Sequence, residues 1–179
     1  MKIETLEIAG FVSAFKALRL SYGKEERSEL WSAAGEREDG TLEAGWSAKL
    51  DERDVDLLQG LVKAGDEHAK VCRGIMVWAR ITAPIYWWCE EETYRAGHER
   101  LMSASTMHID CKGLSGEELQ RAKAEMPMGK ELAKVDCFSY QCLRNIYRQR
   151  KNHRLEEWHQ FCKWIESLPM AAELITVNL

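Results

Sequence analysis

The stretch ITAPIYWWCEEETYRAGHER, residues 81–100, joins an extended segment to a helix and brings tryptophans and glutamates together at the junction. Immediately before and into it, from residue 75 to 82, apolar side chains alternate with the two-residue period of a β-strand. Pro84 lacks a backbone N–H and is favoured in the first turn of a helix. We therefore predict a strand that ends at Pro84, followed by a helix that extends to Arg95.

The three consecutive glutamates of this stretch point to different sides of the predicted helix. Glu91 precedes Arg95 by four residues, which brings the two side chains close enough to pair, whereas Glu92 lies one turn after Trp88. The simplest interpretation is a helix with one apolar face and one solvated acidic face. A role for the tryptophans in binding a ligand stays open at this point.

Two further helices are indicated in the first third of the chain. Apolar residues with helical spacing begin at Phe11 and reach a natural stop at Gly23. A second apolar face covers residues 55–62 and ends near Gly65. Residues 24–50 are charged and contain glycines, so we expect a loop or short hairpin there.

The last third of the chain has the most regular pattern. Residues 138–150 and 154–169 have the spacing of two consecutive amphipathic helices. Before them, Ser115 and Glu118 have the spacing of a capping box, which predicts a short helix that Pro127 closes. The length of 179 residues suits one domain or two tightly joined halves.

Composition narrows the classes of function. The formal net charge of −4 argues against a protein that coats nucleic acid, because such binding depends on many lysines and arginines. No apolar run approaches the roughly 20 residues needed to cross a bilayer, and the first ten residues lack the apolar centre of a signal peptide. We expect a cytoplasmic protein.

The six cysteines are scattered and form no CxxC pair, so neither a zinc site nor a disulfide framework has its usual spacing. We expect reduced, buried cysteines. His108, Asp110 and Cys111 lie close together, but a second group of ligands is missing, which favours a turn with one buried thiol over a metal site. We predict no metal.

One basic segment stands out in this acidic chain. The sequence RNIYRQRKNHR, residues 144–154, includes Arg144, Arg148 and Arg150, and arginine is the side chain best suited to two-pronged contacts with phosphate. The alternative is a basic helix face that pairs with neighbouring acids. Glycine-rich phosphate loops and a GxSxG nucleophile elbow are absent from the sequence.

The order of several motifs resembles the flavin-dependent thymidylate synthase family. The motifs are the pair EH at 67–68, the segment ITAPIY at 81–86, MP at 126–127 and LRNIYRQR at 143–150. The resemblance implies a single α+β domain over residues 1–179, a small sheet with long flanking helices. It also implies a homo-oligomer, a tetramer in the family, that binds FAD and deoxyuridine monophosphate between subunits.

This sequence departs from the family pattern at several arginines. Aligned from Pro84, the Arg-His-Arg positions hold Thr93, Tyr94 and Arg95. The later glutamate of that signature falls on Leu101 and its final arginine on Ser105. Its serine is kept, as Ser103. On the terminal helix, Ser139 and Gln141 replace an asparagine and an arginine, Arg150 is kept, and a further arginine becomes Gln160. Each charge-assisted hydrogen bond to phosphate is worth about 1.5–3 kcal/mol, so these losses count against standard catalysis.

The resemblance supports two functions and one set of candidate residues, beside the alternative of a structural or interaction protein whose tryptophans only seal the oligomer. The first function is a divergent flavin-dependent methylating enzyme, and the second is a protein, such as one encoded by a phage, that senses or sequesters a nucleotide without turnover. The residues assigned to the flavin are His68, Trp87, Tyr94 and His98. Those assigned to the nucleotide are Arg95, Arg100, Ser103, Arg144 and Arg150.

Overall fold

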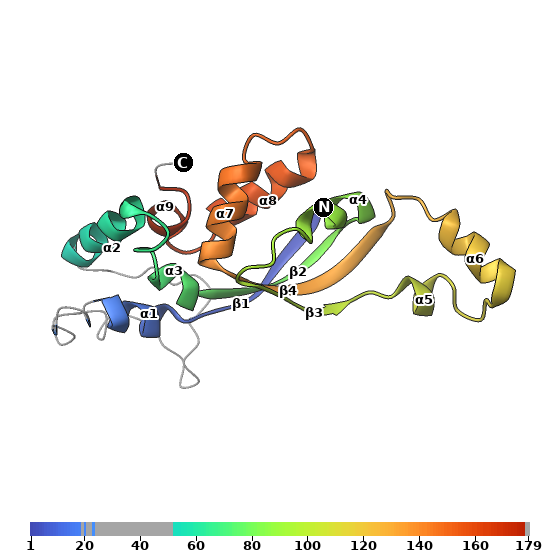
Figure 1. The fold of residues 1–179 in the computed structure, drawn as a ribbon, viewed down its shortest axis with the longest axis horizontal. Coiled ribbons are helices and arrows are strands. Elements are labelled where there is room, and N and C mark those ends of the chain that lie inside the picture. The colour runs from blue at the N-terminus through green and yellow to red at the C-terminus, as the bar shows by residue number, and fades with distance from the viewer. Residues whose placement is uncertain (19, 21–22, 24–51, 178–179) are drawn as a thin grey trace.

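The computed structural model describes residues 1–18, 20, 23 and 52–177, so the predicted loop at 24–50 lies outside the described residues. Four strands form one antiparallel sheet in the order β1-β2-β4-β3 (Figure 1). The strands are β1 (Lys2–Ala9), β2 (Met76–Pro84), β3 (His98–Ser103) and β4 (Glu131–Ser139).

Helices accompany this antiparallel sheet, which confirms the predicted α+β class. The first three are α1 (Phe11–Leu18), α2 (Glu52–Ala64) and α3 (Val71–Gly74), and α4 (Ile85–Glu91) follows β2 directly. The remaining helices are α5 (Thr106–Ile109), α6 (Gly116–Ala124), α7 (Tyr140–Arg150), α8 (Glu156–Glu166) and α9 (Ala171–Leu174). No described helix has both the length and the apolar character needed to cross a membrane.

The predicted strand before Pro84 is confirmed as β2, a central strand of the sheet. The alternate residues that the strand pattern places on one side, Ile75, Val77, Ala79 and Ile81, are all fully buried. Burial of this row against the helices, at roughly 25 cal/mol per Å² of apolar surface, fixes the register of the sheet, because a one-residue slip would expose it. Pro84 ends β2 and precedes the first residue of α4, as predicted.

The helix after Pro84 is shorter than predicted. α4 ends at Glu91, and Arg95 lies in the connection to β3, so the expected pair between Glu91 and Arg95 does not form. Gly97 makes the return to the sheet with φ of +73°, and a Cβ there would lie 2.2 Å from Ser139 Oγ. Only glycine fits both the backbone angle and this close approach.

Three strands were not recognised in the sequence. β1, β3 and β4 carry charged residues that interrupt the apolar alternation, and β4 adjoins the predicted helix at 138–150, which begins only at Tyr140. Ser115 is the N-cap of α6, but its side chain makes no capping hydrogen bond, so the predicted capping box is wrong.

The buried core lies between the sheet and the helices that cover one of its faces. Its largest fully buried side chains include Trp87, Trp88, Trp158, Phe138 and Phe161. Residues 104–130, here called the arm, extend away from this core between β3 and β4 and carry α5 and α6 (Figure 1). The chain therefore divides into a packed body and a projecting arm.

Candidate functional site

The tryptophans and glutamates of α4 have separate structural roles. Trp87 is fully buried, with its ring centroid 4.8 Å from that of Trp158 and 5.4 Å from that of Phe161. Trp88 lies beside it and donates its indole N–H to the backbone oxygens of Ala83 and Leu132, both at 3.1 Å. The tryptophans therefore anchor α4 in the core. Glu91 and Glu92 both contact Arg100, whereas Glu90 contacts Arg150.

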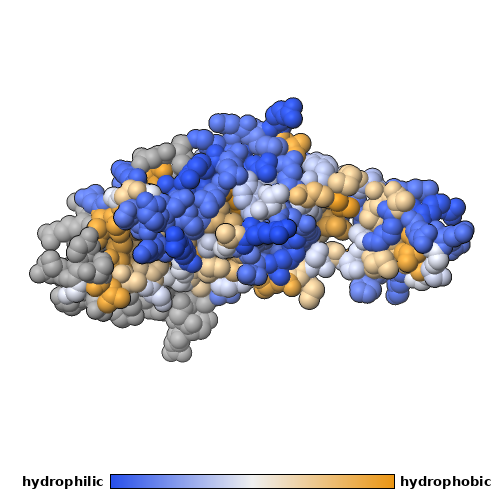
Figure 2. Space-filling view, in the orientation of Figure 1, coloured by the Kyte–Doolittle hydropathy of each residue, from blue (hydrophilic) through white to orange (hydrophobic). Residues whose placement is uncertain are grey.

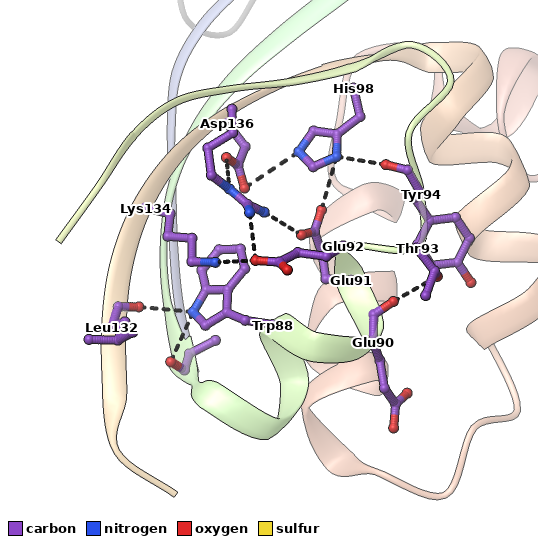
Figure 3. A network of polar contacts seen from close by, with 12 residues as sticks. Trp88, Glu90, Glu91, Glu92, Thr93, Tyr94, His98, Leu132, Lys134 and Asp136 are labelled. Carbon is purple, nitrogen blue, oxygen red and sulfur yellow. Dashed lines mark hydrogen bonds and ion pairs between the residues drawn. The ribbon is translucent and has the colours of Figure 1, made fainter. Parts of the chain in front are cut away.

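Glu91 and Glu92 belong to a compact group of ionisable side chains between α4, β3 and β4 (Figure 3). We call this group the charged cluster; its members are Glu91, Glu92, His98, Arg100, Lys134 and Asp136. Glu91 and Asp136 are fully buried, and Lys134 is nearly so. Buried charges persist only when they are paired. Each member of the charged cluster lies within 3.5 Å of a partner of opposite charge, His98 in its protonated form.

Arg100 occupies the centre of the charged cluster. Its guanidinium donates to Glu91 Oε2 and Glu92 Oε1 at 2.7 Å and to Asp136 Oδ1 at 3.0 Å. The cross-strand register that places Arg100 opposite Asp136 creates the last of these contacts. Lys134 Nζ adds a 2.9 Å contact to Glu92 and lies 4.4 Å from the centre of the Trp88 ring, a cation–π distance.

His98 closes the other side of the charged cluster. Its ring stacks on Phe138 with centroids 4.5 Å apart, and its Nδ1 lies 2.8 Å from the Tyr94 carbonyl oxygen. Burial raises the pKa of Glu91 to about 7. Burial lowers the pKa of His98, but the facing carboxylates of Asp136 and Glu91 outweigh it, so the pKa lies above the ordinary histidine value.

Glu90 points away from the charged cluster and holds Arg150. The two side chains meet at 2.7 Å, and the same carboxylate oxygen accepts the indole N–H of Trp158 at 2.9 Å. Arg150 also donates to the Tyr94 hydroxyl at 2.7 Å and lies 4.6 Å from the centre of the Trp158 ring. Arg150 and Tyr94 thus stabilise the packing of α4 against α7 and α8.

Arg144 is buried in the body rather than displayed on a basic face. It donates to the backbone oxygens of Ile175 and Val62 and lies 3.5 Å from the Asp66 carboxylate. Arg148 reaches the same carboxylate at 3.3 Å. The arginines of α7 therefore pair with neighbouring acids, the alternative that the sequence left open.

His68 is placed differently from the other residues assigned to the flavin. Its side chain is 54% exposed and lines a cavity of about 570 Å³ between α1, α2 and α3. We call this the His68 cavity; its other lining residues are Ser13, Ala14, Ala17, Leu18, Leu61, Glu67, Lys70, Val71 and Gly74. Ligand pockets in proteins occupy roughly 300–1,000 Å³, so the size suits a small organic molecule.

Arg95 and Ser103 are the two predicted nucleotide residues that are exposed. Arg95 makes no hydrogen bond or ion pair with any residue in the described part of the chain. Ser103 ends the edge strand β3, where it pairs with Lys134. Among the described residues, its hydroxyl donates only to the adjacent Ala104 carbonyl oxygen, at 3.4 Å. Neither residue lines the His68 cavity.

No family model and no curated protein matches the sequence. Solved structures do match. ThyX from Helicobacter pylori, a flavin-dependent thymidylate synthase complexed with FAD and dUMP, superposes with a TM-score of 0.71 at 14% identity and covers 100% of both chains. A second structure, thymidylate synthase X from the same organism with FAD and dUMP, gives 0.72 at 13% identity over 98% of each chain. The chain has a ThyX-like fold.

A third solved structure, an enzyme with a different name, also matches the fold. The UMP/dUMP methylase PolB from Streptomyces cacaoi, bound with 5-Br dUMP, matches with a TM-score of 0.64 at 12% identity. That match covers 97% of this chain and 90% of the methylase. At these low identities the likeness establishes the fold, as the motif order had predicted, and not the chemistry.

Asp136 and Lys134 are site residues that the sequence did not reveal. Both lie on β4, the strand that was not recognised, and Asp136 meets Arg100 across 36 positions of sequence. The alternation of charged and apolar residues in ELAKVDCFS was the available signal, because a charge on the inner face of a strand requires a partner.

Proposed function

We propose that this protein binds a nucleotide, FAD or a pyrimidine nucleotide such as dUMP, in the His68 cavity. The observation that carries the proposal is an open cavity of about 570 Å³ lined by His68, the histidine of the EH pair, on a ThyX-like fold. The FAD and dUMP complexes of the similar enzymes support the class of ligand.

The lining of the His68 cavity fits a planar ring better than a diphosphate. Ala14, Leu18 and Val71 provide apolar walls, whereas Lys70 is the one permanent cation among the described lining residues and Glu67 adds a carboxylate to the same lining. His68 and the apolar walls would hold the ring of a flavin, which supplies redox chemistry when it is bound. The phosphates would need cations from outside the described lining.

A second candidate function is nucleotide binding without turnover, and the state of the arginines favours it. Arg100, Arg144 and Arg150 already pair with carboxylates of the same chain. Phosphate would have to displace those carboxylates, and at Arg100 this would leave the fully buried Glu91 and Asp136 unpaired, at a cost of several kcal/mol. Such a protein would sense or sequester its nucleotide.

We also propose that the chain forms a homo-oligomer, a tetramer by resemblance to the family. β3 and the arm expose the large apolar side chains of Leu101, Met102, Met107, Ile109, Leu114 and Met128. Apolar patches appear over this end of the molecule in Figure 2. Clustered exposed apolar side chains mark protein contacts, and a neighbouring subunit could bring Arg95 and Ser103 to a shared ligand site.

The test combines an absorbance spectrum of the purified protein, with and without FAD, and a thermal-shift titration with FAD and dUMP. A ligand at 100 times its dissociation constant adds ~2.7 kcal/mol of stability. Flavin bands together with stabilisation by dUMP would support a synthase-like enzyme, and stabilisation without flavin would support the second function. No response to either ligand would contradict both.

A matched pair of variants ties the response to the cavity. His68→Ala removes the lining histidine, whereas His108→Ala changes an exposed histidine on α5 that does not line the cavity. We expect the ligand response to weaken in the first variant and to persist in the second. An equal loss in both variants would place the ligand elsewhere.

A further inference from the structure

His98 is a buried histidine whose two ring nitrogens both face acceptors. Its side chain is 6% exposed. Nδ1 lies 2.8 Å from the Tyr94 carbonyl oxygen and 3.3 Å from Glu91 Oε1, whereas Nε2 lies 3.5 Å from Asp136 Oδ2 (Figure 3). A neutral imidazole carries one N–H and one lone pair, so it would turn that lone pair toward one of these oxygens. Only the imidazolium places a proton on each side of the ring.

The charges of the cluster lead to the same protonation state. Besides His98, the cluster holds three carboxylates, of Glu91, Glu92 and Asp136, and two permanent cations, Arg100 and Lys134. A protonated His98 makes the cluster neutral, whereas a neutral His98 leaves one negative charge in excess. A proton on Glu91 instead would not suffice, because Nδ1 still donates to Tyr94 and the Nε2 lone pair would face the ionised Asp136.

The other groups packed near the ring do not supply the missing charge. Phe138 of β4 stacks on the ring with centroids 4.5 Å apart. Cys142 of α7 interacts with Glu91, but burial raises the pKa of its thiol to about 12, so the thiol stays neutral. The Tyr94 hydroxyl accepts a hydrogen bond from Arg150, away from the ring. Within the described chain, the second ring proton is therefore the remaining counter-charge for the buried carboxylates.

We propose that His98 is a pH-sensitive switch: as the imidazolium it holds α4, β3 and β4 together, and its deprotonation at alkaline pH loosens β3, the strand that leads into the arm. His98 is the first residue of β3, an edge strand that pairs with β4 alone. β1, the other edge strand, contributes no member of the cluster. No cluster residue lines the His68 cavity, so this proposal and the proposed function fail independently.

The sign of the pH dependence follows from linkage. Burial lowers the pKa of His98, but the facing carboxylates of Asp136 and Glu91 outweigh it and raise the pKa above its ordinary value of 6.5. The stabilisation is therefore fully present below pH 6.5 and is lost as the pH rises through the raised folded-state pKa. Burial also raises the pKa of Glu91 to about 7, which acts in the same direction, and the two groups titrate as a coupled pair.

Side-chain ¹⁵N–¹H NMR spectra of the full, unaltered chain report the protonation of each histidine nitrogen. We expect both nitrogens of His98 to carry protons at about pH 7, where an ordinary histidine is mostly neutral. As the pH rises, Nε2 should lose its proton first, because Nδ1 keeps the Tyr94 acceptor. A neutral His98 ring at about pH 7 would overturn the proposal, and this measurement does not depend on any variant.

Hydrogen exchange of backbone amides tests the loosening of β3, with β1 as the internal control. After correction for the intrinsic rate, β3 amides should exchange about tenfold faster at about pH 9 than at about pH 6, and β1 amides should change by less than about twofold. His98→Gln should abolish this difference between the strands. Equal changes in both strands, or no change in β3, would overturn the proposal.

A matched pair of carboxylate variants tests the cause. Glu91→Gln removes one of the two carboxylates that face the ring, and the proton affinity of His98 should fall about tenfold in the NMR titration. Glu99→Gln makes the same change at the next, exposed position of β3 and should alter that affinity by less than about twofold. Equal effects of the two variants would show that the facing carboxylates do not hold the proton, contrary to the proposal.

Discussion

The charged cluster and the His68 cavity differ in what they leave available to a ligand. In the cluster, Arg100 already contacts three carboxylates, and its neighbours Trp87 and Trp88 are buried. In the cavity, His68 is more than half exposed and the walls are apolar. Trp87 of α4, which the family resemblance assigned to the flavin, is buried within its own chain, whereas His68 of the EH pair lines an open cavity.

Trp87→Ala should have the largest effect on stability. It tests whether Trp87 serves to pack α4 into the core and not to bind a ligand. Loss of a buried tryptophan typically costs 3–5 kcal/mol, because a cavity remains in the core. Urea unfolding of this variant and of Trp87→Phe measures the free energy of unfolding. A Trp87→Ala protein that keeps its stability and loses only nucleotide binding would show that Trp87 belongs to a ligand site, contrary to this expectation.

Arg100→Met should come next, with a loss of about 2–3 kcal/mol. Removing one partner of a buried ion pair leaves its carboxylates uncompensated, and Arg100 is 26% exposed, which moderates the usual cost of 3–5 kcal/mol. Arg95→Met is the matched control, since Arg95 is exposed and pairs with no described residue; its effect should stay within about 0.5 kcal/mol. Equal effects in the two variants would mean that the cluster contributes nothing to folding.

Asp66→Asn tests the ion pairs that Asp66 forms with Arg144 and Arg148 of α7. It removes the carboxylate facing the buried Arg144, and we expect a loss of about 1–2 kcal/mol in urea unfolding at neutral pH. Asp66→Glu is the control that retains a charge. Similar losses in both variants would show that packing, and not charge, matters there.

The same carboxylate gives a pH dependence with a definite sign. Burial raises the pKa of Asp66, but the hydrogen bond and charge of Arg148 and the charge of Arg144 outweigh it, and the pKa lies below the ordinary value of 3.8. A lowered folded-state pKa means that the stabilisation is fully present above pH 3.8 and is lost as the pH falls through the lowered pKa. Asp66→Asn should show a shallower loss of stability below that pH than the parent.

The parts of the fold that the sequence revealed are those with local patterns. The buried row of β2, the start of α4 at Pro84 and the apolar face of α8 each follow from residues within one element. The cluster could not be predicted, because the contact between Arg100 and Asp136 depends on the register of two strands. The pairing of Glu91 with Arg95 is favourable only on a continuous helix, and α4 ends at Glu91, so Arg95 is not on the helix.

His68→Ala should have the smallest effect on stability and the sharpest effect on function. An exposed side chain contributes within about 0.5 kcal/mol to folding, so this variant should unfold as the parent does. If His68 contacts the nucleotide, losing that contact should weaken binding about tenfold, which is 1.4 kcal/mol. Isothermal titration with FAD and with dUMP measures this difference. If this variant binds every ligand of the parent with unchanged affinity, His68 has no role in binding. The exposure of the His68 side chain would then not show that the cavity is more available to a ligand than the charged cluster.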